Sequence, residues 1–309
     1  MAFAYLRFTT ESIVIKKQLK PGNPVLLLRN IVAVMLLMSG SLVIAAESNP
    51  EQAARAALDA FLVDWNLSDL AALQEHLSFP HVTHGPGFFV IAQEEGQFAQ
   101  DFAALRATGW QRSSFDHFEV LQVSDSKVNF LVDFTRYRSN GEIMSTSQVF
   151  YVVTKQEGGW GMQYRSGGAG ADSLSEAARD RAILEATSAL YDFFAAFNGK
   201  DNDALFEVNH VPQLMLNGDI FIHATDRDSP PVAVDFARLI ESESWDFSTV
   251  EDLEVIQAMP DKVIFQLVFE RFNSDGIKYR RVPALWVLTK IDGKWGVQFR
   301  SLMPPVITQ

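Results

Sequence analysis

The sequence predicts an α+β protein that carries the same domain twice, each copy with about three helices packed on one face of a curved antiparallel sheet. The first observation is internal similarity, because residues 110–166 align with residues 245–301 at a constant offset and without a gap. Of the 57 aligned positions, 21 are identical. The second observation is that the apolar residues of each copy change from helical to alternating spacing along the chain. Together they indicate a tandem duplication.

Each copy opens on an amphipathic helix. Apolar residues recur at helical spacing from Ala54 to Trp65 in the first copy and from Ile183 to Phe197 in the second. An extended segment is expected after Pro80 and after Pro212. Two shorter helices are predicted in each copy, at residues 70–77 and 98–107 and at residues 204–208 and 232–241.

Four alternating segments close each copy. Asn140-Gly141 in the first copy and Asp275-Gly276 in the second lie between alternating runs, which is the strongest short-range signal of a β-hairpin. Strands joined by such short turns pair antiparallel. Each copy is therefore predicted to end in a four-stranded meander.

The chain divides into four segments. A basic residue, Arg29, precedes an apolar run at residues 31–46 that ends in small residues, which is the layout of a secretory signal peptide. Signal cleavage implies a periplasmic or secreted protein, and the alternative is an inner-membrane anchor formed by residues 31–46. The predicted segments are a signal peptide at 1–46, a first domain at 47–166, a linker at 167–174 and a second domain at 175–309.

The composition limits the possible partners and chemistries. The chain has 26 Lys and Arg against 38 Asp and Glu, and the part after residue 46 carries a net charge of −16. Such a body repels nucleic acid and anionic lipid surfaces. The absence of cysteine excludes disulfides, thiolate catalysis and thiolate zinc sites. No nucleophile elbow, phosphate-binding loop or dinucleotide fingerprint is present, so hydrolase and nucleotide-dependent functions are disfavoured.

Three motifs of the first copy are distinctive. They are Phe79-Pro80-His81, the segment from Asp125 to Tyr137, and the segment from Trp160 to Ser166. With the element order, they resemble the nuclear transport factor 2-like superfamily, which includes SnoaL-like cyclases, ketosteroid isomerases, scytalone dehydratase and limonene epoxide hydrolase, and in particular a bacterial branch without an established activity. The second copy has Val211-Pro212-Gln213 in place of Phe-Pro-His. The resemblance implies two cone-shaped domains, each with a cavity between helices and sheet, and leaves the chemistry open.

One face of the predicted sheet points at the helices and supplies candidates for a ligand pocket. Centring the hairpins on their turns places Phe134 opposite Ser147 and Tyr151 opposite Tyr164, and alternation then selects one face. The ligand-pocket candidates are Arg136, Tyr151, Tyr164, Trp160, Arg271, Arg280, Trp286 and Trp295 on this face, and His223 from an earlier segment of the second copy.

Arg136 and Arg271 end the apolar rows on this face. On the preceding strand of each copy, Asp116 and Glu251 are expected to lie near them. Two interpretations stay open. Each arginine either forms a structural ion pair at the rim of the cavity, or binds an anion or acts in catalysis.

His81 and His84 are three positions apart on an extended segment, so they face opposite ways and cannot easily hold one metal ion. We therefore predict no metal site and no cofactor. A pocket histidine that acts as a general base is the alternative to a core or rim histidine. If the protein is an enzyme, the expected catalytic residues of the first copy are His81, His84, Asp116, Arg136, Tyr151 and Tyr164.

The outer face of each predicted sheet is half apolar and needs a cover. Phe150 and Leu285 are examples of large apolar residues on this face. We expect the two copies to bury these faces against one another, which makes one chain an intrachain pseudo-dimer. A homodimer through the same faces is the alternative.

Two classes of function remain. The first is an exported, non-catalytic module that binds a small apolar or amphipathic molecule, or a partner protein, in one or both cones. The alternative is a cofactor-free lyase, isomerase or epoxide hydrolase of the SnoaL-like type that acts in the first domain. We expect the first. The two differ in whether a base, an orienting partner and a donor converge in one closed cavity.

Overall fold

The computed structural model describes residues 49–85, 87–168 and 175–307. The predicted signal peptide at residues 1–46, its alternative as a membrane anchor, and most of the predicted linker lie outside the described residues.

No helix in the described part of the chain combines the length and the apolar character needed to cross a membrane.

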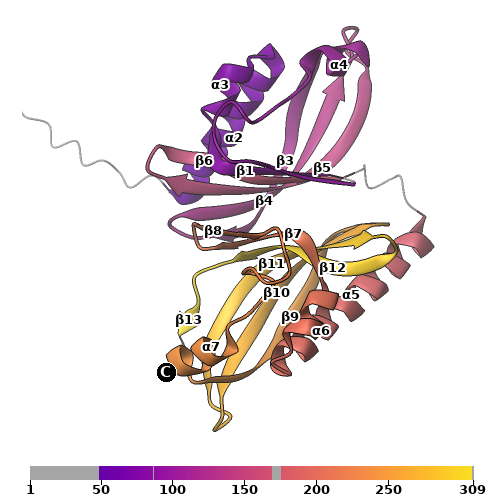
Figure 1. Cartoon of the computed structure of the whole chain (residues 1–309). Coiled ribbons are helices and arrows are strands. Elements are labelled where there is room, and N and C mark those ends of the chain that lie inside the picture. The colour runs from indigo at the N-terminus through magenta and orange to yellow at the C-terminus, as the bar shows by residue number, and fades with distance from the viewer. Residues whose placement is uncertain (1–48, 86, 169–174, 308–309) are drawn as a thin grey trace, which may run out of the picture. The chain divides into compact units, whose positions relative to one another are not determined.

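The first domain consists of helices on one face of a six-stranded sheet (Figure 1). The strand order is β2-β1-β6-β5-β4-β3, in which β1 and β6 run parallel and the other neighbours run antiparallel. The elements are α2 (Pro50–Leu67), α3 (Leu70–Gln74), β1 (Leu77–Gly85), β2 (Phe88–Ala92), α4 (Phe102–Ala107), β3 (Arg112–Val123), β4 (Lys127–Tyr137), β5 (Ile143–Gln156) and β6 (Gly159–Gly167).

The second domain repeats this architecture. Its sheet has the order β8-β7-β12-β11-β10-β9, β7 and β12 run parallel, and a short last strand pairs with β11. Its elements are α5 (Glu176–Asn198), α6 (Asn202–Glu207), β7 (Asn209–Asn217), β8 (Ile220–Ala224), α7 (Phe236–Glu243), β9 (Trp245–Met259), β10 (Lys262–Asn273), β11 (Lys278–Ile291), β12 (Lys294–Leu302) and β13 (Val306–Ile307). The α+β class with two tandem domains is confirmed.

The third helix of each domain begins later in the chain than predicted. Helix α4 begins at Phe102 rather than at residue 98, because the Asp101 carboxylate caps it and accepts a hydrogen bond from the Ala104 amide at 2.8 Å. Asp235 caps α7 in the same way. The apolar residues that suggested an earlier start belong to the loop before each cap.

Each domain buries an apolar core between its helices and one face of its sheet. Trp110 lies two residues before β3, Trp245 is the first residue of β9, and both are almost completely buried. Their indole N–H groups donate to Ser113 and Ser248, both at 2.9 Å. The two domains thus repeat even this hydrogen bond.

The register of the last hairpin differs from the prediction. In the first domain Tyr151 lies opposite Arg165, rather than opposite Tyr164. A β-bulge at Gln163 inserts one residue between Met162 and the next paired position. Every side chain after the bulge therefore points to the opposite face from the one that strict alternation predicts.

The sheet faces away from the helices are also apolar, and they share one buried cluster. Phe150 and Tyr164 of the first domain and Leu285 and Phe299 of the second belong to it. The rings of Tyr164 and Phe299 stack with centroids 3.8 Å apart. These two residues occupy equivalent positions in the two domains, as the aligned sequences require.

Candidate functional site

The first domain holds a cavity of about 490 Å³ between helix α2 and the sheet. Its walls are largely aromatic, with Phe61 and Trp65 from α2, Phe115 from β3 and Phe134 from β4. The α2 residues come from the apolar stripe that the helical spacing of the sequence defines. A cavity of this size with apolar walls suits a small organic molecule.

Two arginines and a tyrosine contribute polar atoms to this cavity. Arg136 comes from β4, Tyr151 from β5 and Arg165 from β6. Burial raises the pKa of Tyr151 to about 12, and the charges of Arg165 and Arg136 oppose this rise. All three side chains line the same cavity. An arginine stays charged at neutral pH, so the polar part of this cavity is cationic.

Neither arginine has a carboxylate partner among the described residues. The Nε of Arg165 donates to the Thr83 hydroxyl at 3.2 Å, whereas the Nε of Arg136 is buried without an acceptor. No Asp or Glu is among the residues that line the cavity. None of the ion pairs within the described residues involves Arg136 or Arg165.

The predicted proximity of Asp116 to Arg136 is wrong. The Asp116 carboxylate accepts hydrogen bonds from the hydroxyls of Ser114 at 2.7 Å and Thr135 at 2.6 Å. Thr135 precedes Arg136 on β4, so its side chain points to the other face of the sheet. A register shift in β3 leaves Ser113 opposite Arg136 and removes Asp116 from the cavity.

His81 is held as a structural residue rather than as a free base. Its Nδ1 donates to the Met162 carbonyl at 2.9 Å, and its Nε2 lies 3.3 Å from the Thr83 hydroxyl. Burial, aided by the Arg165 charge, lowers the pKa of His81 to about 3. The ring is therefore neutral at neutral pH, and the Thr83 hydroxyl engages its remaining lone pair.

His84 and Tyr164 bond to one another. The Nδ1 of His84 lies 2.7 Å from the Tyr164 hydroxyl. Burial, with a smaller effect of the Lys262 charge, lowers the pKa of His84 to about 3. His84 reaches the edge of the first cavity, but Tyr164 does not line it. The prediction of Tyr164 as a pocket residue is wrong, because the bulge in β6 turns its ring away from the helices.

Arg165 and Arg300 are two pocket residues that were not predicted from the sequence. Both follow a bulge, at Gln163 in β6 and at Gln298 in β12, and both line the cavity of their domain. Strict alternation places them on the outer face. One signal in the sequence could have drawn attention to these two arginines: the quartet Gln-aromatic-Arg-Ser recurs at the same place in both copies.

The second domain has a cavity of about 390 Å³ in the equivalent place, and Arg271, Arg280 and Trp286 line it. Here the chain supplies a carboxylate. Glu243, the last residue of α7, lies 2.5 Å from the Nη1 of Arg271 and 2.7 Å from the Nη1 of Arg280. Arg271 is the counterpart of Arg136, so the same arginine is paired in one domain and unpaired in the other.

The remaining predicted residues lie elsewhere. Glu251 pairs with Arg281 at 2.5 Å, and its predicted proximity to Arg271 is therefore wrong. The indole of Trp295 donates to Glu185 on α5 at 2.9 Å, which holds this ring at the edge of the core. Besides Tyr164, three further pocket candidates line neither cone cavity: Trp160, Trp295 and His223.

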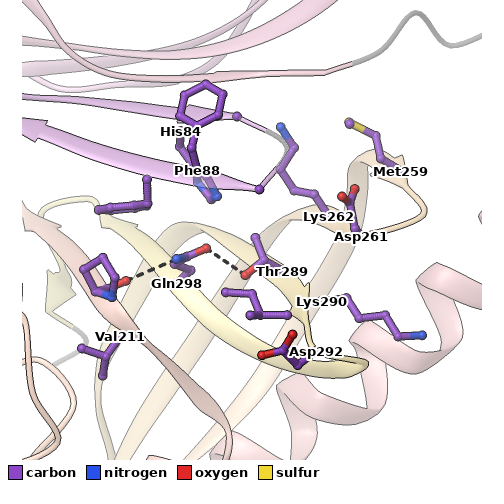
Figure 2. Close-up of a pocket in the computed structure, with 15 residues that line it drawn as sticks. His84, Phe88, Val211, Met259, Asp261, Lys262, Thr289, Lys290, Asp292 and Gln298 are labelled. Atoms are coloured by element: carbon purple, nitrogen blue, oxygen red, sulfur yellow. Dashed lines mark hydrogen bonds between the residues drawn. The ribbon is translucent and has the colours of Figure 1, made fainter.

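A third cavity of about 390 Å³ lies where the outer sheet faces meet (Figure 2). Figure 2 shows His84 and Phe88 on one wall and Thr289 and Gln298 on the other. Gln298 accepts a hydrogen bond from the Thr289 hydroxyl at 2.9 Å and donates to the Pro212 carbonyl at 3.4 Å. Since these polar groups bond to one another, the first-domain cavity is the stronger candidate site.

Within the described residues, no group of three or more His, Asp or Glu side chains is placed to hold a metal ion.

The family comparison bears on the first domain. Residues 50–163 match a family model described as NTF2-like protein (DUF6841). The first domain is an NTF2-like domain. The match runs from the start of α2 into β6 and confirms the resemblance that the sequence motifs indicated. The comparison with curated proteins gives no match.

Solved structures of NTF2-like proteins resemble part of the chain. An NTF2-like protein with a cystatin-like fold from Novosphingobium aromaticivorans is 19% identical over 50% of this chain and 95% of that chain, with a TM-score of 0.35. A ketosteroid isomerase-like protein from Erwinia carotovora atroseptica is 18% identical over 38% and 92%, with a TM-score of 0.30. An NTF2-like protein of unknown function from Shewanella oneidensis is 16% identical over 38% and 98%, with a TM-score of 0.31.

Proposed function

We propose that the first NTF2-like domain is a non-catalytic module that binds a small apolar or amphipathic molecule in its cavity. The observation that carries the proposal is an aromatic-walled cavity of about 490 Å³ whose nearby histidines are both hydrogen-bonded and have pKa values of about 3. A general base works best when its pKa lies near the working pH. His81 and His84 do not meet this condition, whereas the cavity meets the requirements for binding.

The alternative, a cofactor-free lyase, isomerase or epoxide hydrolase, has less support. Arg136, Arg165 and Tyr151 offer hydrogen-bond donors to a bound molecule, and none of them is a proton acceptor at neutral pH. The nearest predicted carboxylate, Asp116, lies on the other face of the sheet. Such an enzyme would have donors that stabilise negative charge but no base to create it.

We further propose that the chain is exported to the periplasm or secreted, and that its two domains act as an intrachain pseudo-dimer. The small-residue end of the run at residues 31–46 supports export. The apolar cluster shared by the two sheets supports the pseudo-dimer. The intact mass of the protein from its native envelope tests export, because cleavage removes residues 1–46 and a membrane anchor retains them.

Binding is tested with N-phenyl-1-naphthylamine, a neutral apolar dye that fluoresces when it leaves water. We expect saturable binding to the protein that carries both domains. Ser147 of β5 lines the first cavity and Val282 of β11 lines the second at the equivalent position, so they form a matched pair. Ser147→Phe should fill the first cavity and abolish dye binding, whereas Val282→Phe should leave it unchanged.

Unchanged melting temperatures will show that both variants fold. Absence of dye binding to the parent, or loss of binding in Val282→Phe alone, contradicts the proposal of a first-domain site.

A further inference from the structure

We infer that the molecule bound by the first domain carries a carboxylate, and that Arg136 and Arg165 hold this group beneath an apolar body that fills the aromatic part of the cavity. This inference rests on the proposed binding function and names the ligand class. It comes from a comparison of the two domains of this one chain.

The second domain shows what an arginine at this position binds. The Glu243 carboxylate receives hydrogen bonds from Arg271 at 2.5 Å, from Arg280 at 2.7 Å and from the Tyr279 hydroxyl at 3.2 Å. Two guanidinium groups and one phenol thus surround one carboxylate. The group comes from α7 of the same domain and lines the cavity of that domain.

The first domain also has two guanidinium groups, Arg136 and Arg165, and a phenol, Tyr151, in its cavity. Of these, Arg136 occupies a position equivalent to a donor of the second domain, because it aligns with Arg271. The residue two positions before Trp110 is Thr108, where Glu243 stands two positions before Trp245. The first domain therefore has no counterpart of the Glu243 carboxylate beside Arg136.

Charge and burial favour an external carboxylate beside Arg136. The Nε of Arg136 is buried without an acceptor, and no acidic residue lines the cavity. A desolvated guanidinium gains a charge-assisted hydrogen bond when a carboxylate enters, and the planar fork of arginine matches that group. The aromatic side chains Phe61, Trp65 and Phe115 would contact the apolar remainder. The expected ligand is a small monocarboxylate with an apolar chain or ring.

The first test compares octanoate with 1-octanol, which have the same chain length and differ in charge. Titration calorimetry on the protein that carries both domains should give octanoate at least about tenfold tighter binding than 1-octanol. Arg136→Met should remove this preference and leave 1-octanol binding within about threefold of the parent, because Met keeps the apolar wall. Arg271→Met is the matched second-domain control and should leave the octanoate preference intact.

A second pair of variants places a carboxylate inside the first cavity. Ser145 lies directly opposite Arg136 in the β4–β5 ladder, so a side chain there reaches the guanidinium across the strands. Ser145→Glu should imitate Glu243 and abolish the octanoate preference. Ser145→Gln has the same length without the charge and should retain it.

These tests can overturn the carboxylate inference without overturning the proposed binding function. Equal binding of octanoate and 1-octanol by the parent, or an octanoate preference that survives both Arg136→Met and Ser145→Glu, overturns the carboxylate inference. In that event binding of N-phenyl-1-naphthylamine in the first cavity still supports the proposed function. Failure of the neutral dye to bind overturns the proposed function itself.

Discussion

Arg136 and Arg271 are the same residue in two copies of one domain, yet their surroundings differ in charge. Arg271 contacts the Glu243 carboxylate, which is largely buried, while Arg136 contacts no carboxylate among the described residues. Burial is the main cause that lowers the pKa of the Arg136 guanidinium from its ordinary value. A half-buried cation that lacks a partner pays a desolvation cost without the gain of an ion pair, and it remains available for a ligand.

This difference predicts opposite effects of one substitution. Arg271→Met leaves Glu243 with fewer partners and should lower the free energy of unfolding by about 1–3 kcal/mol. Arg136→Met removes a guanidinium without a carboxylate partner and should change it by less than about 0.5 kcal/mol. Urea denaturation of both variants measures the two values. A loss in Arg136→Met as large as that in Arg271→Met would show that Arg136 has a structural partner.

At the scale of elements, a bulge in β6 and another in β12 change which face of the sheet the following side chains occupy. Before Gln163, Met162 belongs to the core under the helices, and after it Tyr164 belongs to the cluster between the sheets. The bulge then returns Arg165 to the cavity. One extra residue thus places an apolar ring on the outer face and a cation on the inner face of the same strand.

The contact between the outer faces of β5 and β12 can be measured as a coupling energy. Phe150 is fully buried, and its ring centroid lies 6.2 Å from that of Phe299. Phe150→Ala should lower the free energy of unfolding by about 3–5 kcal/mol. Val63→Ala on the exposed side of α2 is a control that should cost less than about 1 kcal/mol, because its side chain is 59% exposed.

The double variant Phe150→Ala/Phe299→Ala tests the contact itself. If the two rings touch, the double variant should lose about 0.5–1.5 kcal/mol less than the sum of the single losses. Strict additivity would mean that the two sheets do not meet at these rings in solution.

At the scale of the whole molecule, two buried lysines link the domains reciprocally. Lys127 donates to the Leu302 carbonyl at 2.7 Å, and Lys262 donates to the Gly167 carbonyl. Lys127 and Lys262 are equivalent in the aligned copies, and so are Gly167 and Leu302. Reciprocal contacts of this kind are the pattern that a two-fold interface produces, and they support the proposed intrachain pseudo-dimer.

These lysines predict how stability depends on pH. Burial lowers the pKa of Lys127 to about 7 and that of Lys262 to about 8, from an ordinary value of 10.5. Between these values and 10.5 the unfolded chain binds more protons than the folded one, so the stability contribution of each lysine should rise with pH. Below about pH 7 the folded protein must bury charged ammonium groups, and this contribution is lost.

The measurement is urea denaturation of the parent and of Lys127→Met/Lys262→Met from pH 6 to pH 10. The free energy of unfolding of the parent, relative to the double variant, should increase over this range. Parallel curves would mean that the folded state does not lower the pKa of either lysine. Exposed Lys155→Met is a control that should not change the slope.

The sequence by itself determined the duplication, the α+β class, the turns of the meander and the position of Arg136 on the inner face. These features depend on local chemistry. Asn-Gly and Asp-Gly turns set the register of neighbouring strands, and alternation then assigns each side chain to a face. The prediction that Phe134 lies opposite Ser147 is confirmed for this reason.

Only the tertiary structure decided which charges meet and which face each residue takes after a bulge. A bulge cannot be recognised from the alternation of residue types in the sequence. Strict alternation therefore assigned Tyr164 and Arg165 to the wrong faces of the sheet. Glu243 reaches Arg280, 37 positions later, because the docking of α7 on the sheet brings them together. Such a contact depends on how distant elements pack, and no local pattern of residue types encodes that geometry.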